Sequence, residues 1–407
     1  MRPMAKVFVL NAHSRHGLVS IRCLGGRGLD VTAGSSRRFH AGRLSRYVDR
    51  FVAYPSPIDA PEAFVRAIEA ELQRADYDML LPVNEATVET VVQHRDRFEA
   101  HTTVPFLPYD QLAVGLDKRR TVEAARAHDV PHPETRFAEE FDIDTVGDEL
   151  GYPVVVKPTR GSSRNGVSVC HSRADLERTL RETPARYRPL LVQEFVPFGH
   201  EVGVYTLYDC SGTLTGLTVQ KRLRSNPPEG GASTYRETIR DPELVALADE
   251  FLTALEWRGL AMVEFRVDAD TGEPKLLEIN PRLWGSLALS VYAGVEFPYL
   301  LYQLAIGDDV DPQLEYAVGV RARCLFTDAQ QVLAREDRAT ALAEFLTPSS
   351  KPCCYDIVSK RDPLPTFGQF AYAVSCLFDR GHDTESGPVD DPDDVSETPP
   401  ELSPPLS

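Results

Sequence analysis

The sequence predicts an α/β protein with an N-terminal doubly wound parallel sheet, followed by a region of α+β character. Two observations lead to this prediction, and a third concerns the C-terminal tail. Short apolar runs alternate with amphipathic helical segments in residues 1–110, and strand-like runs dominate from about residue 130 to about residue 279. Residues 381–407 contain eight acidic residues, six prolines and no lysine or arginine. Strands that alternate with helices favour a parallel sheet, and the acidic, proline-rich composition favours a disordered tail.

The N-terminal region contains four short apolar segments and two helical ones. Strands are expected at residues 6–10, 29–33, 50–53 and 78–83, and helices at residues 18–24 and 61–74. In the second helix, Phe64, Ile68 and Leu72 follow at i,i+4 spacing and share one face. The first turn lacks the Gly-x-Gly-x-x-Gly pattern, so a dinucleotide site there has little support.

The middle of the chain begins with an expected helix at residues 118–128 and continues as a strand-rich region to about residue 279. One helix, at residues 242–255, is expected to interrupt it, and another follows at residues 297–306. We treat residues 331–380 as a C-terminal extension, in which no motif can be interpreted.

The composition excludes several classes of protein. The net charge of −17 argues against a nucleic-acid partner. No apolar run approaches the ~18 residues of a membrane span, and the apolar stretch near the start, residues 7–10, is too short for a signal peptide. Seven scattered cysteines without Cys-x-x-Cys spacing favour reduced thiols. The expectation is a cytoplasmic protein without membrane partners.

A predicted β-hairpin carries a pair of carboxylates. Residues 270–272, Asp-Thr-Gly, form a turn signal between two alternating runs, and this register places Glu264 opposite Glu278. Asn280 lies on the same face, two residues further along the strand. Two carboxylates and an amide suit Mg²⁺. The alternative is that Arg266, on the same face, neutralises the pair.

Two other stretches could contact a nucleotide. Lys157, one of only seven lysines, ends a valine-rich strand and precedes a loop from Gly161 to Gly166 that could turn N–H groups toward phosphate. Glu201 follows the apolar strand of residues 190–196 and could accept hydroxyl groups of a ribose. Alternatively, the loop is an ordinary turn, and Glu201 is a glutamate on the protein surface.

The loop of residues 220–234 places several cations beside two glycines. Lys221, Arg222, Gly230 and Gly231 could hold an anionic substrate. Alternatively, the segment is only the basic tip of a hairpin.

Taken in order, these stretches resemble the ATP-grasp superfamily, and in particular its members related to the large subunit of carbamoyl-phosphate synthase. The resemblance covers roughly residues 5–330. It rests on Lys118, Lys157, the Gly161–Gly166 loop, the Gln-Glu-Phe-Val of residues 193–196, and the Glu-x-Asn-Pro-Arg of residues 278–282, which follows Glu264 by fourteen residues. It implies a pre-ATP-grasp domain at 1–110 and an ATP-grasp domain at 111–330, with a lid at about 130–200.

The resemblance also implies roles for individual residues. Lys118 and Lys157 would bind the phosphates of ATP. The loop over them would include Ser162, Ser163, Gly166 and Val167. The adenosine would contact Glu194, Val196, Glu201 and Leu277. Mg²⁺, or alternatively Mn²⁺, would bind Glu264, Glu278 and Asn280. Arg282 and Lys157 would be the catalytic residues, and Arg282 would stabilise the transferring phosphoryl group.

The function implied is an ATP- and Mg²⁺-dependent ligase. It would phosphorylate a small carboxylic acid to an acyl phosphate and couple this to an amine. The alternatives are an enzyme that forms carboxyphosphate, a kinase of an acceptor, or a nucleotide-binding regulator without turnover. A homodimer is compatible with this interpretation. The sequence names neither the acid nor the amine.

Overall fold

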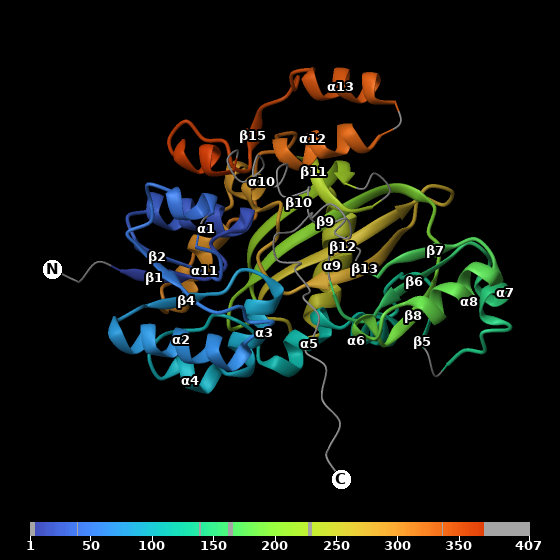
Figure 1. Ribbon diagram of the computed structural model, residues 1–407, viewed down its shortest axis with the longest axis horizontal. Coiled ribbons are helices and arrows are strands. Elements are labelled where there is room, and N and C mark those ends of the chain that lie inside the picture. Colours follow the sequence, from blue (N-terminus) through green and yellow to red (C-terminus); the bar gives the residue numbers. More distant parts are fainter. Residues whose placement is uncertain are drawn as a thin grey trace, which may run out of the picture.

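A computed structural model describes residues 5–38, 40–137, 140–161, 166–226, 230–335 and 337–369. Figure 1 shows three sheets side by side, with helices packed around them. The predicted mixed α/β class is confirmed. The expected tail at 381–407 lies outside the described residues.

The N-terminal sheet is fully parallel and has the strand order β3-β2-β1-β4. Its strands are β1 (Lys6–Val9), β2 (Asp30–Ser35), β3 (Arg50–Ala53) and β4 (Met79–Leu81). Its helical segments are α1 (Arg15–Gly26), η1 (Ala41–Leu44), α2 (Pro61–Arg74), α3 (Glu85–Gln93) and α4 (Arg95–Glu99). Helix α1 begins three residues before the predicted start because Ser14 caps it, its hydroxyl accepting from the backbone N–H of Gly17 at 3.0 Å.

Two helices, α5 (Tyr109–Leu116) and α6 (Lys118–Ala127), connect this region to a small antiparallel sheet of order β5-β8-β6-β7. Its strands are β5 (Thr135–Phe137), β6 (Val154–Pro158), β7 (Ser168–Cys170) and β8 (Leu190–Glu194). Helical segments α7 (Val146–Leu150), α8 (Arg173–Glu182) and η2 (Ala185–Tyr187) accompany it. The expectation of a single helical interruption was therefore wrong. Helix α8 is mostly charged and buries only Leu176 fully, so its apolar periodicity is faint.

The largest sheet has seven strands in the order β13-β12-β9-β10-β11-β14-β15. The strands are β9 (Phe198–Tyr208), β10 (Leu214–Asn226), β11 (Ala232–Thr238), β12 (Gly259–Asp268), β13 (Pro274–Asn280), β14 (Arg321–Arg323) and β15 (Cys353–Tyr355). Around it lie α9 (Pro242–Ala254), α10 (Leu287–Tyr292), α11 (Phe297–Ala305), α12 (Leu325–Ala334) and α13 (Arg338–Leu346). The predicted hairpin is present as β12 and β13, with Glu264 opposite Glu278.

The C-terminal extension joins the other parts of the molecule. Strand β15 pairs with β14 at the edge of the large sheet. Beyond it, the buried Asp356 accepts from Arg236 of β11, and the buried Asp362 accepts from Arg22 of α1 at 2.8 Å. This segment therefore ties the N-terminal sheet to the large one.

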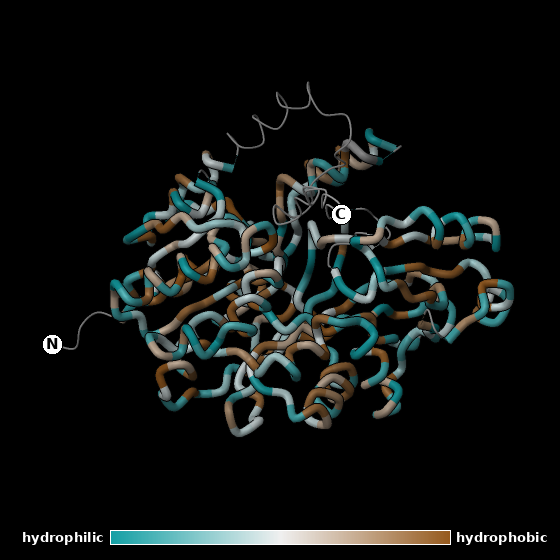
Figure 2. Tube along the Cα trace, turned by 60° about the horizontal axis from the view of Figure 1, so that its bottom comes forward, coloured by the Kyte–Doolittle hydropathy of each residue, from teal (hydrophilic) through white to brown (hydrophobic). Residues whose placement is uncertain are grey.

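The core is apolar and continuous between these two sheets, and a smaller cluster lies under β6 and β8. In Figure 2, many helices alternate between brown and teal along the tube, as expected of helices with one face in the core. Among the described residues, no helix is long and apolar enough to cross a membrane.

Candidate functional site

A cavity of about 490 Å³ lies where the three sheets approach one another. Its walls come from β6 and β8 of the small sheet, β9–β13 of the large sheet, and the turn after β1. The predicted site residues that line it are Lys118, Lys157, Val167, Glu194, Val196, Glu201, Arg222, Gly230, Gly231, Glu264, Leu277, Glu278, Asn280 and Arg282. Gly166 and Lys221 are not part of the lining, and Ser162 and Ser163 lie outside the described residues.

Two lysines reach the cavity from different elements. Lys118 is the first residue of α6, and Asp117 caps this helix. The Nζ of Lys118 donates to the carbonyl of Gly161 at 2.6 Å. The same Nζ lies 3.7 Å from a carboxylate oxygen of Glu278. Lys157 is buried at the end of β6. Burial, and then the positive charge of Lys118, lower the pKa of Lys157 to about 7. An anion placed between the two ammonium groups would offset both effects.

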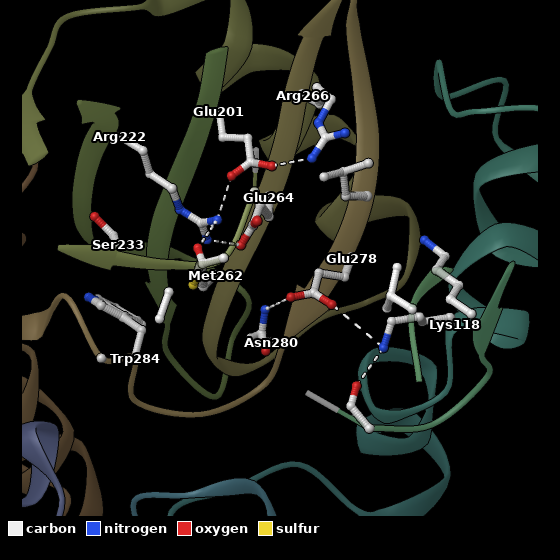
Figure 3. A pocket seen from close by; sticks show the side chains of 18 of the residues that line it. Lys118, Glu201, Arg222, Ser233, Met262, Glu264, Arg266, Glu278, Asn280 and Trp284 are labelled. Carbon is white, nitrogen blue, oxygen red and sulfur yellow. Dashed lines mark hydrogen bonds and ion pairs between the residues drawn. The ribbon is translucent and has the colours of Figure 1, made fainter. Parts of the chain in front are cut away.

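The two opposed carboxylates have different surroundings (Figure 3). Glu264 is buried, and its burial together with the charges of Glu278 and Glu201 raises its pKa to about 7 despite the neighbouring Arg222. Burial also acts to raise the pKa of Glu278. Lys118 and the amide of Asn280 outweigh this effect and lower the pKa of Glu278 below its usual value. That amide donates to Glu278 at 2.9 Å.

Of the two opposed carboxylates, only Glu264 forms an ion pair with an arginine among the described residues, and that arginine is Arg222, so the expected alternative of Arg266 was wrong. Arg222 on β10 donates to Glu264 at 2.6 Å and to Glu201 at 2.6 Å. Arg266 instead lies opposite Glu201 on the neighbouring strand β9, and donates to it at 2.6 Å. A register shift after Glu264 separates Arg266 from Glu278.

Glu201 is therefore held by two guanidinium groups. Its burial acts to raise the pKa, but Arg222 and Arg266 lower it below the usual value. Its carboxylate is ionised, and hydroxyl groups of a ligand would compete with these arginines for it. The neighbouring Glu194 forms an ion pair with Lys275, and its backbone N–H donates to the carbonyl of Glu134 at 2.8 Å.

The residues present fit a divalent cation. Glu264, Glu278 and Asn280 each carry a side-chain oxygen, the ligand atom that Mg²⁺ prefers. Burial, together with the charges of Glu278 and Glu201, raises the pKa of Glu264, and a bound cation would offset this effect. No group of three or more His, Cys, Asp or Glu residues suited to a metal occurs within the described part of the chain. Two carboxylates with an open remainder of the shell are typical of Mg²⁺ bound together with phosphate.

Sequence reasoning missed one end of the cavity. Arg15, Ser233 and Trp284 line it together with Gly285 and Ser286. Trp284 lies two residues after the Asn-Pro-Arg motif, and this proximity was the available signal. Arg15 gave no such signal, because only the tertiary fold brings the start of α1 to this site.

Two family profiles match the chain. Residues 186–325 match "ATP-grasp in the biosynthetic pathway with Ter operon", and residues 128–225 match the "D-ala D-ala ligase C-terminus". The two matches together cover the small sheet and most of the large one.

Curated relatives and solved structures agree with these profiles. The chain is 37% identical over 184 residues to a D-alanine–D-alanine ligase of Chromohalobacter salexigens, covering 41% of this chain and 55% of that protein. It is 26% identical over 181 residues to the N-terminal section of a carbamoyl phosphate synthase large chain of Methanopyrus kandleri, covering 42% of this chain and 32% of the relative. The chain thus spans about half or less of these two proteins.

Among solved structures, a biotin carboxylase of Campylobacter jejuni, described as a "beta-gamma-ATP complex", superposes with a TM-score of 0.66. The sequences are 16% identical, and the alignment covers 78% of this chain and 74% of that one. This likeness shows a shared fold. ATP and Mg²⁺ are the cofactors expected for this fold, and both fit the lysines and carboxylates described above.

Proposed function

Since the chain carries an ATP-grasp domain, we propose that it is an ATP- and Mg²⁺-dependent ligase. It phosphorylates a small carboxylic acid and joins the resulting acyl phosphate to an amine. The observation that carries this proposal is the set of groups in one cavity: two lysines, two opposed carboxylates with an amide, and Arg282. Binding a nucleotide alone would need fewer of them.

Each group has a task in phosphoryl transfer, which depends on positioning and charge neutralisation. Lys118 and Lys157 would hold the phosphates, and Lys157 becomes a stronger electrostatic partner once an anion restores its proton. Glu264, Glu278 and Asn280 would hold Mg²⁺, which supplies charge neutralisation at the phosphates when bound. Arg282 would stabilise the transferring phosphoryl group. Its guanidinium donates to the carbonyl of Leu283 at 3.1 Å, and no carboxylate within the described residues forms an ion pair with it.

The two chemical steps balance without another reactant. An oxygen of the substrate carboxylate attacks the γ-phosphorus, and the bond to the β,γ-bridging oxygen of ATP breaks, releasing ADP. The amine then attacks the acyl carbon, phosphate leaves, and the amine loses a proton. Acyl phosphates hydrolyse, so water must be excluded between the steps.

The proposed organisation follows the same interpretation. Residues 1–110 form the pre-ATP-grasp domain, residues 111–330 the ATP-grasp domain with its lid at about 130–200, and residues 331–380 the extension. A small-molecule acid and an amine are the proposed partners, and a homodimer stays a prediction.

A hydroxylamine trap tests the function. The protein is incubated with MgATP, hydroxylamine and pools of carboxylic acids, and hydroxamate and ADP are measured. Hydroxamate from one pool is expected, since hydroxylamine captures an acyl phosphate. ADP that depends on bicarbonate, without hydroxamate, would instead indicate carboxyphosphate. ATP binding with neither product, across all pools, would refute the ligase and favour a regulator.

A further inference from the structure

The phosphoryl-transfer steps above leave one cation of the cavity, Arg222, without a task. Its side chain is 17% exposed and comes from β10 of the large sheet. Figure 3 shows it on the other side of the two opposed carboxylates from Lys118, toward Ser233 and Trp284 at the far end of the cavity. In the proposed function the phosphates of ATP lie on the side of Lys118. Arg222 therefore lies where a second substrate would approach the γ-phosphate from the side opposite the nucleotide.

Both terminal nitrogens of Arg222 bind carboxylates of the protein. Nη1 donates to Glu201 at 2.6 Å and to the carbonyl of Gly231 at 3.1 Å, and Nη2 donates to Glu264 at 2.6 Å. The pairing of β10 with β11 shifts directly after Arg222, and a bulge of this kind re-aims a side chain. The side chains of the two glutamates are 2% and 8% exposed, so the guanidinium connects two buried anions.

The two glutamates that hold Arg222 are the ones assigned above to ATP and to the metal. Glu264 would bind Mg²⁺, and Glu201 would accept hydroxyl groups of the ribose. Glu201 has a second cation, Arg266, which donates to it at 2.6 Å. Within the described residues, Arg222 is the one cation that forms an ion pair with Glu264. Glu264 therefore provides the negative charge that balances Arg222.

Metal binding would change this balance of charge. Mg²⁺ between the two opposed carboxylates brings two positive charges to two negative ones, so Glu264 would no longer compensate Arg222. A largely buried guanidinium without a counter-charge is strongly unfavourable. A substrate carboxylate at the same place restores the balance, and the planar guanidinium matches it with two parallel N–H bonds. An anion next to Arg222 is thus favoured only after the metal site is filled.

We propose that Arg222 exchanges its partners during the reaction. Glu201 and Glu264 hold it before ligands bind, and the reacting carboxylate of the acid substrate binds it once Mg²⁺ and ATP occupy those glutamates. The inference rests on the proposed function and adds an order of binding, with the nucleotide before the acid. It also assigns a residue to the acid, whose carboxylate lies between Arg222 and the γ-phosphate. Because such coupling is reciprocal, the acid in turn tightens the binding of the nucleotide.

Arginine footprinting tests the exchange without knowledge of the acid. Phenylglyoxal modifies guanidinium groups more slowly when they are held in ion pairs, and peptide mass spectrometry reports each arginine separately. The protein is treated briefly, so that few arginines react in each molecule. We expect Arg222 to react slowly without ligands and several-fold faster with Mg²⁺ and a non-hydrolysable ATP analogue. A rate that the nucleotide and metal leave unchanged, or lower, would overturn the proposal.

Two matched variants separate the exchange from a general loss of negative charge. Glu264→Gln and Glu278→Gln each remove one carboxylate of the proposed metal site, but Glu264 pairs with Arg222 and Glu278 with Lys118. Without ligands, Glu264→Gln should raise the reactivity of Arg222 several-fold, and Glu278→Gln should leave it unchanged. Equal reactivity of Arg222 in the two variants would refute the pairing. If Glu264→Gln does not fold, the comparison with and without nucleotide decides on the unchanged protein.

Binding and kinetics test the contact with the acid. The acid that gives hydroxamate in the trap is titrated by calorimetry, and it should bind about 10- to 100-fold more tightly with Mg²⁺ and the analogue than without them. Arg222→Gln should raise the KM for this acid about 10- to 100-fold, as expected for loss of a charged hydrogen-bond donor. The KM for ATP should change little, because Glu201 keeps Arg266.

Arg266→Gln is the control for this contact, because it removes the other partner of Glu201 and leaves the pair of Arg222 with Glu264 intact. It should leave the KM for the acid unchanged. Acid binding that is equally tight without nucleotide, or a KM for the acid that Arg222→Gln does not raise, would refute the exchange.

The exchange and the ligase function can fail separately. If Arg222 responds to Mg²⁺ and the analogue as expected but neither hydroxamate nor ADP forms, the ligase is refuted and the exchange stands. If hydroxamate forms while Arg222 is equally reactive with and without nucleotide, the ligase stands and the exchange is refuted.

Discussion

Lys157 should take up a proton when ATP binds. In the free protein, burial and Lys118 lower its pKa to about 7, so the side chain is mostly neutral at pH 8. The phosphates of ATP favour the charged form and raise the pKa in the complex. With a free-state pKa of about 7, binding should take up about 0.9 proton at pH 8 and about 0.1 at pH 6. Affinity should therefore fall as pH rises above 7, by about tenfold per unit.

Isothermal titration calorimetry measures this uptake. ATP is titrated in two buffers of different ionisation enthalpy, and the difference in heat gives the number of protons bound. Excess EDTA is included, because a metal at Glu264, whose pKa is raised to about 7, would release a proton and mask the uptake. Lys157→Arg is the matched variant, since arginine keeps its charge throughout this range. The difference between the two proteins removes the protonation of ATP itself.

Two results would refute the reasoning. One is a proton uptake on ATP binding that is equal at pH 6 and pH 8 after the uptake of the Lys157→Arg variant has been subtracted. The other is an uptake at pH 8 that persists undiminished in Lys157→Arg. Lys118→Arg is a second control, which should retain the uptake because Lys157 is unchanged.

Three further changes test other parts of the structure. Glu278→Ala should abolish product formation in the hydroxylamine assay, because the proposed metal site loses a ligand; near-normal turnover would remove Glu278 from that site. Asp356→Asn should destabilise the protein by about 3–5 kcal/mol in urea unfolding, since it leaves the buried Arg236 uncompensated. The exposed Asp309→Asn should change stability by less than about 0.5 kcal/mol, and equal effects of the two would mean that the extension is not docked through this pair. Deletion of residues 381–407 should leave activity and melting temperature unchanged, because their composition cannot form a core; a lower melting temperature would show that they pack on the protein.

Local patterns in the sequence determined much of the end of the cavity that holds Lys157 and the two carboxylates. The period of two residues along a strand, together with the turn at residues 270–272, placed Glu264 opposite Glu278. The valine-rich run placed Lys157 at the end of a strand. These inferences succeeded because each depends on residues close together in the chain, where spacing translates directly into geometry.

Only the tertiary structure decided which charges meet. Arg222 is 42 residues from Glu264, and Arg15 is 341 residues from Asp356. The first contact depends on the order of strands in the large sheet, and the second on the docking of the extension against α1 and β11. Side-chain periodicity tells which face of a strand is buried but not which strand lies beside it. The sequence by itself therefore determined the local placement of Lys157 and the two carboxylates on their strands, and the packing of distant segments decided the ionic partners of the carboxylates and the far end of the cavity.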